Sequence, residues 1–137
     1  MNRRFLGVDY GRRRTGLSLS DPEGRLAWPL DTLKARGLDD LTKRVAERAR
    51  VEEATRIVLG SPMHLDGSPG DLEPEVEDLA DRLRARGLEV VLWDERLTTW
   101  EATEALRHAP DRVRRNKERI DAVAAAILLQ SYLDSLK

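Results

Sequence analysis

The chain has 137 residues, of which 40% are hydrophobic and 36% charged, with a formal net charge of -1 and no cysteine. This size and apolar content predict one globular domain over 1–137. The near balance of charge argues against a protein that is basic throughout, so nucleic-acid binding would have to rest on local patches. The lack of cysteine excludes disulfides, thiolate metal sites and a cysteine nucleophile. No apolar run reaches the roughly 18 residues of a membrane span and no signal-peptide core is present, so we expect a cytoplasmic protein without membrane association.

The first third of the chain predicts an antiparallel meander. An apolar run ending near Tyr10 predicts a strand whose side chains alternate between two faces. After a turn at 11–14, the segment 15–20 alternates again and predicts the second arm of a hairpin. The segment 25–33 predicts a third strand, in which Pro29 indicates an edge or a bulge.

The rest of the chain alternates helices with short apolar runs. Residues at helical spacing predict a helix over 38–54 and a second helix that ends at Gly87. The runs 56–60 and 88–95 lie between helical patterns, which is typical of buried parallel strands.

Two further helices complete the chain: a capping box at 98–101 predicts the start of one, and 120–136 predicts a strongly apolar last helix. The order of elements predicts an α/β protein with a mixed five-stranded sheet flanked by helices. Its strands would be an antiparallel hairpin and a third strand, followed by two parallel strands. Ligands of such sheets gather at the carboxyl ends of the parallel strands.

Three carboxylates interrupt segments that are otherwise predicted to be buried. Asp9 lies in the first strand, Glu95 closes the last strand, and Asp121 lies on a small, apolar face of the last helix. Three anions in one dry site are unfavourable unless a cation neutralises them. With no cysteine and only His64 and His108 as imidazoles, the ligands are hard oxygens, which favour Mg²⁺ or Mn²⁺ over zinc. Two such ions about 4 Å apart can activate a water and stabilise the leaving oxygen of a phosphodiester.

Each acid taken singly also has a purely structural explanation. Asp9 could accept hydrogen bonds from backbone amides of the turn 12–14. Glu95 could pair with Arg96, and the helix dipole could stabilise Asp121. The three acids together, in this order of strands and helix, favour the metal site.

Four ordered motifs resemble one known family and span nearly the whole chain. They read LGVDYGRRRTGLSLSD, IVLGSPMHLDGSPG, DERLTTWEA and KERIDAVAAAILLQSYL. They are similar to the motifs of the YqgF (RuvX-like) family, which belongs to the ribonuclease H-like superfamily and is related to the Holliday junction resolvases. The resemblance implies a ribonuclease H-like fold with Asp9, Glu95 and Asp121 as metal-binding catalytic carboxylates.

The resemblance also implies a function. The role assigned to the family is a nuclease that matures the 5′ end of pre-16S ribosomal RNA, and an older assignment by analogy is the resolution of Holliday junctions in branched DNA. The partners implied are nucleic acid and ribosomal assembly particles.

Two positions depart from the expected pattern. Related resolvases carry a further acid three residues beyond the last aspartate, where this chain has Ala124, and fewer ligands would weaken a second metal site. The family motif usually has asparagine where this chain has His64, which is either a substituted loop residue or a contact to phosphate.

Two basic clusters are candidates for substrate binding. Arg12, Arg13 and Arg14 follow Asp9 directly and would bind phosphates that flank the scissile bond. The structural alternative is a solvated hairpin tip.

The second cluster lies in the run DRVRRNKER at 111–119, just before Asp121, where Arg114, Arg115 and Lys117 are candidate substrate contacts. Its alternative is a solvated charged segment. Arg96, which follows Glu95, could bind phosphate or hold the carboxylate.

Two rival classes of protein are weaker fits. The first motif also resembles the phosphate loop of sugar kinases, actin and Hsp70 chaperones, but this chain has room for one lobe and lacks their second phosphate loop. A non-catalytic RNA-binding module of ribosome assembly would not need all three acids. The last helix carries more apolar surface than one face can bury, which predicts a monomer or a weak homodimer.

Overall fold

Five strands form one mixed sheet in the order β3-β2-β1-β4-β5. The structure, a computed structural model, describes residues 2–61, 70–97 and 117–137. The strands are β1 (Phe5–Asp9), β2 (Thr15–Ser20), β3 (Ala27–Leu33), β4 (Arg56–Ser61) and β5 (Val90–Asp94). The pairs β1–β2 and β2–β3 are antiparallel, whereas β1–β4 and β4–β5 are parallel. The predicted mixed sheet is therefore confirmed.

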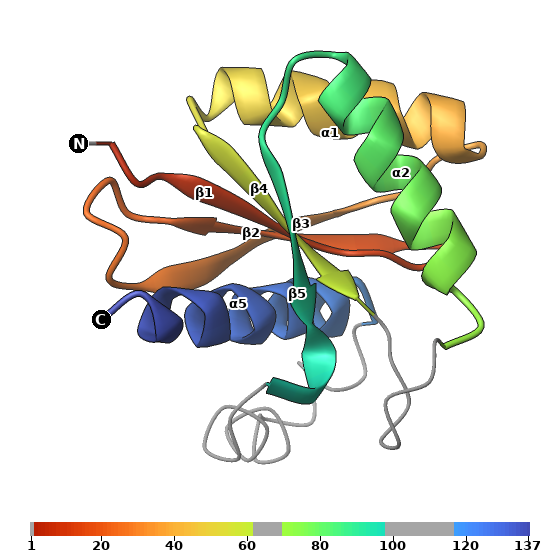
Figure 1. The fold of residues 1–137 in the computed structure, drawn as a ribbon. Helices are drawn as coiled ribbons and strands as arrows, with labels where there is room; N and C mark the ends of the chain where they lie inside the picture. The colour runs from red at the N-terminus through yellow and green to blue at the C-terminus, as the bar shows by residue number, and fades with distance from the viewer. Residues whose placement is uncertain (1, 62–69, 98–116) are drawn as a thin grey trace.

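Helices cover both faces of this sheet (Figure 1). Helices α1 (Leu38–Val51) and α2 (Glu73–Ala85) lie on one face, and α5 (Lys117–Ser135) crosses the other. A single turn of 3₁₀ helix, η1 (Glu95–Leu97), follows β5 directly. Among the described helices, none has the length and hydropathy that a bilayer crossing requires.

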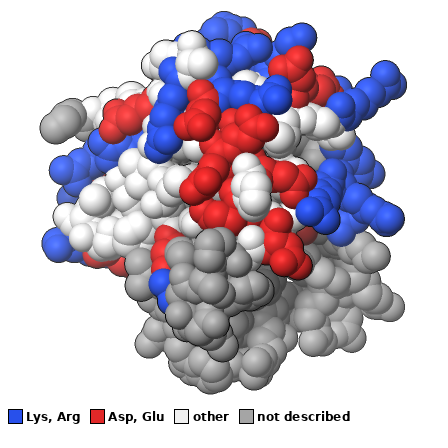
Figure 2. Space-filling view, turned by 45° about the vertical axis from the view of Figure 1, so that its right-hand side comes forward, with Lys and Arg blue, Asp and Glu red and all other residues white. Residues whose placement is uncertain are grey.

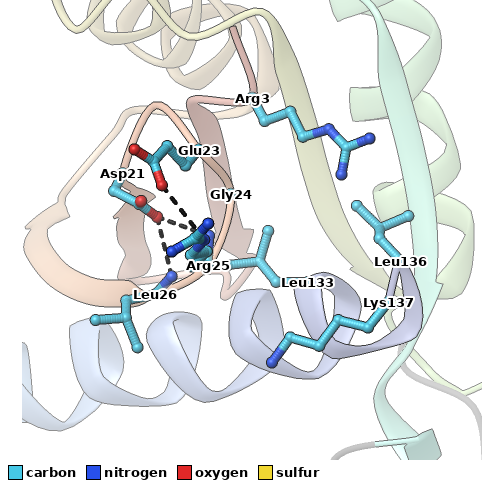
Figure 3. A pocket seen from close by; sticks show the side chains of 9 residues that line it. All are labelled: Arg3, Asp21, Glu23, Gly24, Arg25, Leu26, Leu133, Leu136 and Lys137. Atoms are coloured by element: carbon cyan, nitrogen blue, oxygen red, sulfur yellow. Dashed lines mark hydrogen bonds and ion pairs between the residues drawn. The ribbon is translucent and has the colours of Figure 1, made fainter. Parts of the chain in front are cut away.

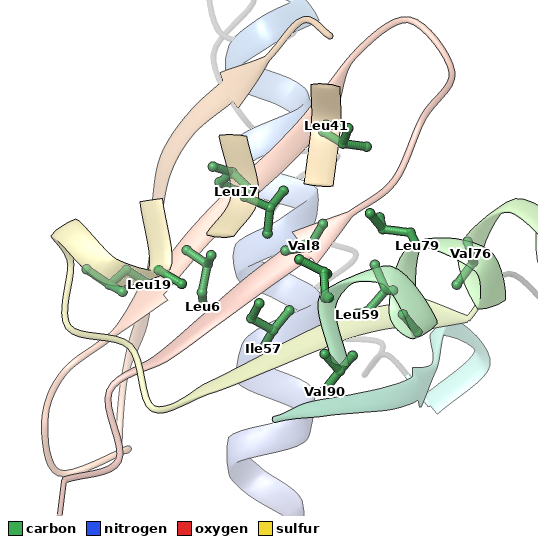
Figure 4. Close-up of a cluster of buried hydrophobic side chains, with 14 residues drawn as sticks. Leu6, Val8, Leu17, Leu19, Leu41, Ile57, Leu59, Val76, Leu79 and Val90 are labelled. Carbon is green, nitrogen blue, oxygen red and sulfur yellow. The ribbon is translucent and has the colours of Figure 1, made fainter. Parts of the chain in front are cut away.

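Strand β1 separates two regions of the core because its side chains alternate between the faces of the sheet. Leu6 and Val8 are fully buried in the cluster beneath α1 and α2 (Figure 4). Phe5 faces the other way and packs in the cluster that contains Leu129 of α5. Asp9, two pleats further along the same face, therefore ends the strand on the side of α5.

Strand β3 is an edge of the sheet, as Pro29 predicts. The register against β2 shifts between Leu17 and Ser18, where the partners change from Asp31 to Pro29 and leave Leu30 as the extra residue. Proline has no N–H to donate to a neighbouring strand. In an edge strand with a bulge, this missing donor does not interrupt the hydrogen bonds inside the sheet. Both the edge and the bulge are confirmed.

Helix α1 is shorter than the predicted 38–54. It ends at Val51, and Glu53 adopts a left-handed backbone with φ of 57°. The N–H of Ala54 then donates to the carbonyl of Ala49 at 2.8 Å. The apolar spacing could not reveal this stop because no glycine marks it. The predicted helix that starts at 98–101 lies outside the described residues.

Helix α5 confirms the predicted apolar helix and begins slightly earlier, at Lys117. Every residue over 120–133 is buried or half-buried in the isolated chain. The apolar surface on which a homodimer was predicted is thus largely covered within one chain, and the oligomeric state stays a prediction.

Candidate active site

The carboxyl of Asp9 is hydrogen-bonded to Glu95 and within electrostatic range of Asp121. Its pKa is raised from 3.8 to about 8, chiefly by burial, then by the charge and the hydrogen bond of Glu95, and least by the charge of Asp121. A carboxyl with such a pKa holds its proton at neutral pH, so Asp9 can donate a hydrogen bond to Glu95. The three predicted acids therefore lie at the same end of the sheet, and their assignment as metal ligands stays a prediction.

Glu95 reaches this position because the neighbouring strand offers no side chain there. It is the first residue of η1 and follows the end of β5. A Cβ atom on Gly60 of β4 would lie 2.6 Å from Oε1 of Glu95 and 3.0 Å from Leu128. Gly60 therefore leaves the space that the Glu95 carboxyl occupies between β4 and α5.

Asp121 is placed by close packing of the α5 backbone on β2. A Cβ atom on Gly16 would lie 2.0 Å from the carbonyl oxygen of Asp121, so only glycine permits this approach. One turn further along, the hydroxyl of Ser18 donates to the carbonyl of Ala125 at 2.7 Å in a buried position. These two backbone contacts fix the start of α5 against the hairpin.

The carboxylate of Asp121 forms an ion pair within the site. Nε of Arg14 donates to Oδ2 of Asp121 at 2.7 Å, and both side chains are about three-tenths exposed. Within the described residues, no three carboxylates or imidazoles converge closely enough to ligate one ion in this conformation. Asp9 thus keeps its proton beside Glu95, whereas Asp121 forms an ion pair with Arg14.

The donor set nevertheless fits a hard divalent cation. All three groups are carboxylates, and a buried acid pair that retains a proton at neutral pH is a pair whose negative charge lacks a counter-ion. A cation of the Mg²⁺ or Mn²⁺ type would supply that charge with the oxygen ligands it prefers. The residues that would hold it are Asp9, Glu95 and Asp121.

The other predicted arginines of the hairpin turn lie in different surroundings. Nε of Arg12 donates to Glu75 of α2 at 2.9 Å, and the hydroxyl of Tyr10 donates to the same carboxylate at 3.0 Å. Arg13 is exposed and has no described ion pair. Glu75 therefore links Tyr10 and Arg12 to α2, whereas Arg13 is exposed to solvent.

Arg96 contacts Asp94, and the two predicted alternatives for it, binding phosphate or holding Glu95, stay predictions. Its guanidinium makes a bidentate pair with Asp94, at 3.1 Å from Nε to Oδ1 and 2.6 Å from the terminal nitrogen to Oδ2. Its backbone N–H also donates to Asp94. These contacts to Asp94 are local, since the 3₁₀ turn brings near neighbours in the chain together.

Some predicted site residues lie outside the described part of the chain. These are Arg114, Arg115 and the loop residue His64. Lys117 begins α5, but its side chain is likewise not described. Their predicted contacts to substrate stay predictions.

Sequence reasoning missed the pairing of Arg12 with Glu75 and of Arg14 with Asp121. Glu75 and Asp121 are 63 and 107 positions away from the arginines they bind, so no local pattern could have paired them. Gly16 and Gly60 did carry a signal, because glycine inside a strand marks a close backbone approach.

A separate cavity of about 800 Å³ lies at the far end of β1 and α5 (Figure 3). Its lining mixes charged and apolar side chains: Arg3, Asp21, Glu23, Arg25, Leu26, Leu133, Leu136 and Lys137, with Gly24. Within it Arg25 pairs with Glu23 at 3.3 Å. None of the three acids of the candidate site lines this cavity.

The arrangement of strands and helices is that of the ribonuclease H-like class. The fold is similar to Thermus thermophilus RuvC in complex with a Holliday junction substrate, with a TM-score of 0.64 and 16% sequence identity over 98% of this chain and 96% of that chain. It is also similar to the fowlpox virus resolvase in complex with Holliday junction DNA, with a TM-score of 0.60 and 13% identity over 97% and 98% of the two chains. At these identities the likeness concerns the fold.

The family follows from the sequence. A family model described as "RuvX: Holliday junction resolvase" matches residues 3–135, and the chain belongs to this family. Relatives named "Putative pre-16S rRNA nuclease" include one from Anaeromyxobacter dehalogenans, 41% identical over 96% of both chains. Another is from Thermus thermophilus, 38% identical over 92% of this chain and 93% of that protein. The predicted family is confirmed.

Proposed function

We propose that this protein is a divalent-metal-dependent nuclease that hydrolyses phosphodiester bonds, with Asp9, Glu95 and Asp121 holding the metal. The observation that carries the proposal is that acids from β1, η1 and α5 lie close enough to interact electrostatically at one end of the sheet, where Asp9 has a pKa of about 8. A structural role alone gives no reason to place three partly buried carboxylates together, because their mutual repulsion destabilises the fold.

The cation proposed is Mg²⁺ or Mn²⁺. When bound, it supplies Lewis acidity that activates a water for attack on phosphorus and stabilises the charge on the departing oxygen. The chain itself contributes a fixed frame, because Gly16 and Gly60 let backbone and carboxylate approach closely. Exposed Arg13 at the hairpin tip provides a guanidinium for a phosphate next to the scissile bond. Arg114, Arg115 and Lys117 are proposed to add further phosphate contacts.

The surface charge limits how nucleic acid can approach. Figure 2 shows acidic side chains gathered in a band on one face, with Lys and Arg on either side of it. Helix α2 contributes acids to the surface, among them Glu77 and Asp81, which are exposed. Because the acidic band repels a polyanion, the phosphate backbone is expected to follow the Lys and Arg beside the band instead.

The substrate proposed is the 5′ end of pre-16S ribosomal RNA, presented on ribosomal assembly particles. The names of the relatives support it, at about 40% identity over nearly the full length. Branched DNA is the second candidate, because the matching family model is described as a Holliday junction resolvase. We propose that the single domain 1–137 acts in the cytoplasm. A resolvase would need a dimer to match the two-fold symmetry of a junction, whereas RNA trimming would not.

The test compares the wild type with Asp9→Asn on a precursor ribosomal RNA and on a synthetic four-way DNA junction, each with Mn²⁺ and with EDTA. Cutting of the RNA that needs Mn²⁺ and is lost in the variant supports the proposed nuclease. Paired symmetric nicks in the junction support a resolvase instead. If neither substrate is cut in an Asp9-dependent way, the nuclease proposal is wrong and a non-catalytic RNA-binding module explains the fold better.

A further inference from the structure

The ion pair between Arg14 and Asp121 has a consequence for metal binding. The carboxylate oxygen Oδ2 of Asp121 is 2.7 Å from Nε of Arg14. A divalent cation bound by this carboxylate would stand a few ångströms from the guanidinium, and the two positive charges would repel each other.

The geometry of this pair is built into the fold rather than set by a mobile surface contact. Gly11 lies so close to Arg14 that a Cβ atom would be 2.3 Å from the Arg14 carbonyl, which fixes the turn. The hydroxyl of Thr15 closes the same turn by donating to the carbonyl of Gly11 at 3.3 Å. For the partner residue, the lack of a side chain on Gly16 lets the backbone of Asp121 pack directly against β2. Both partners therefore start from fixed backbone positions.

We infer that Arg14 is the internal counter-ion of Asp121 in the metal-free site, and that it leaves this carboxylate when a divalent cation binds there. This inference rests on the proposed function. The released guanidinium remains at the hairpin turn, beside the acids, where a phosphate of the nucleic acid is its natural partner. Arg14 thus couples the two ligands: the cation frees Arg14 for phosphate, and phosphate frees Asp121 for the cation. By linkage, each ligand then strengthens the binding of the other by the same factor.

The chain offers a matched control for this role. Arg13 carries the same charge one residue away, is exposed, and has no described ion pair. Arg13→Gln therefore removes the same charge from nearly the same place without removing the contact to Asp121. Arg14→Lys keeps the positive charge but replaces the planar guanidinium by a compact ammonium group on a flexible aliphatic chain.

The first experiment titrates Mn²⁺ alone into the nucleic-acid-free protein and follows free Mn²⁺ by electron paramagnetic resonance. Arg14→Gln is expected to bind Mn²⁺ about tenfold more tightly than the wild type. The gain for Arg13→Gln should stay below about threefold, as for an exposed charge. Arg14→Lys should lie near the wild type. Circular dichroism checks that each variant is folded.

The outcomes separate this inference from the function on which it rests. Equal gains for the Arg14 and Arg13 variants, or weaker binding by Arg14→Gln, would overturn the counter-ion role while leaving the metal site intact. If neither the wild type nor Arg14→Gln binds Mn²⁺ in a way that Asp9→Asn abolishes, both the metal site and the counter-ion role are wrong.

A second experiment needs no metal and stays informative if Arg14→Gln is poorly folded in the first. Fluorescence anisotropy measures binding of a labelled short RNA duplex in EDTA to the wild type and to Asp121→Asn, each with Arg14 or with Arg14→Gln. Asp121→Asn should strengthen RNA binding about fivefold by releasing Arg14, and this gain should vanish in the Arg14→Gln background. Arg14→Met, which also lacks the charge, is the background to use where the glutamine variant does not fold. An equal gain in both backgrounds would overturn the coupling.

Discussion

The two ends of helix α5 are built on opposite principles. Toward its C-terminal end, Leu129 and Leu133 are fully buried, and the Tyr132 ring packs edge-on against Phe5 and Trp93 with centroids 5.9 and 5.3 Å apart. Such contacts stabilise the fold through burial of apolar area and ring geometry.

At its N-terminal end the same helix presents Asp121 to Arg14 and places it near Asp9 and Glu95. Gathering these acids lowers stability in the absence of a cation. The comparison shows that the two ends of α5 have different roles. The apolar C-terminal end stabilises the packing of the helix on the sheet. This packing offsets the cost of placing three acids at the N-terminal end. The predictions below test that division.

The largest effect is expected from neutralising an acid at the charged end. Glu95→Gln and Asp121→Asn should each lower the cleavage rate by about three orders of magnitude or more, because each removes a ligand charge from the metal site. Glu77→Gln, which neutralises an exposed acid on α2, is the matched control and should leave the rate unchanged. Single-turnover cleavage of the precursor RNA measures all three, and full activity in Glu95→Gln would remove that residue from the site.

A substitution at the contact between β2 and α5 should affect function more than stability. Gly16→Ala would bring a Cβ atom to 2.0 Å from the carbonyl oxygen of Asp121, so the start of the helix must move. We expect at least about a tenfold loss of cleavage, because displacements near 1 Å are costly at an active site, with destabilisation of about 1–3 kcal/mol.

Leu129→Ala provides the opposite case at the apolar end. It should destabilise the protein by about 2–5 kcal/mol, as for a large buried side chain cut to alanine. The fraction that remains folded should cleave at the wild-type rate. Urea unfolding and cleavage assays distinguish the two variants, and the division of α5 fails if Leu129→Ala loses activity while folded and Gly16→Ala does not.

The site should also reveal itself through the pH dependence of stability in EDTA. Because the pKa of Asp9 is raised from 3.8 to about 8, the native state keeps a proton that the unfolded chain releases near its ordinary pKa. The free energy of unfolding must then fall as the pH rises from the ordinary pKa to the raised one. Above the raised pKa of Asp9 it stays at this lower value.

Asp9→Asn removes this titration. Its free energy of unfolding should exceed that of the wild type by on the order of 1–3 kcal/mol at about pH 8, and by clearly less at about pH 5. Urea unfolding at both pH values measures the difference. A variant that is less stable than the wild type at the higher pH would contradict the raised pKa of Asp9.

How much of this was predictable differs between the sheet and the site. The succession of strands and helices follows from alternation and from buried apolar runs, and Pro29 indicates the edge position or the bulge of β3. The stop of α1 at Glu53 does not, because a left-handed glutamate has no sequence signature. The three acids are predictable because charge inside apolar segments is conspicuous. The pairing of Asp121 with Arg14 is not, because it depends on how closely a helix approaches a strand more than a hundred residues earlier in the chain.

The smallest effect concerns one hydrogen bond at the apolar end. The guanidinium of Arg56 donates to the hydroxyl of Tyr132 at 2.6 Å and also pairs with Glu89. Tyr132→Phe keeps the ring contacts but removes this acceptor, which should cost about 1 kcal/mol. Thermal unfolding measures it. Cleavage should be unaffected, and a loss of activity in this variant would show that the two ends of α5 are not independent.

The central claim is that Asp9, Glu95 and Asp121 form one cation site at the end of the sheet. The most direct test is a crystal of the wild-type protein soaked in Mn²⁺, with the ion located by its anomalous scattering. The account predicts a peak at ligand distance from oxygens of all three carboxylates, with the guanidinium of Arg14 moved off Asp121. A peak elsewhere on the acidic surface, or none between these residues, would contradict it.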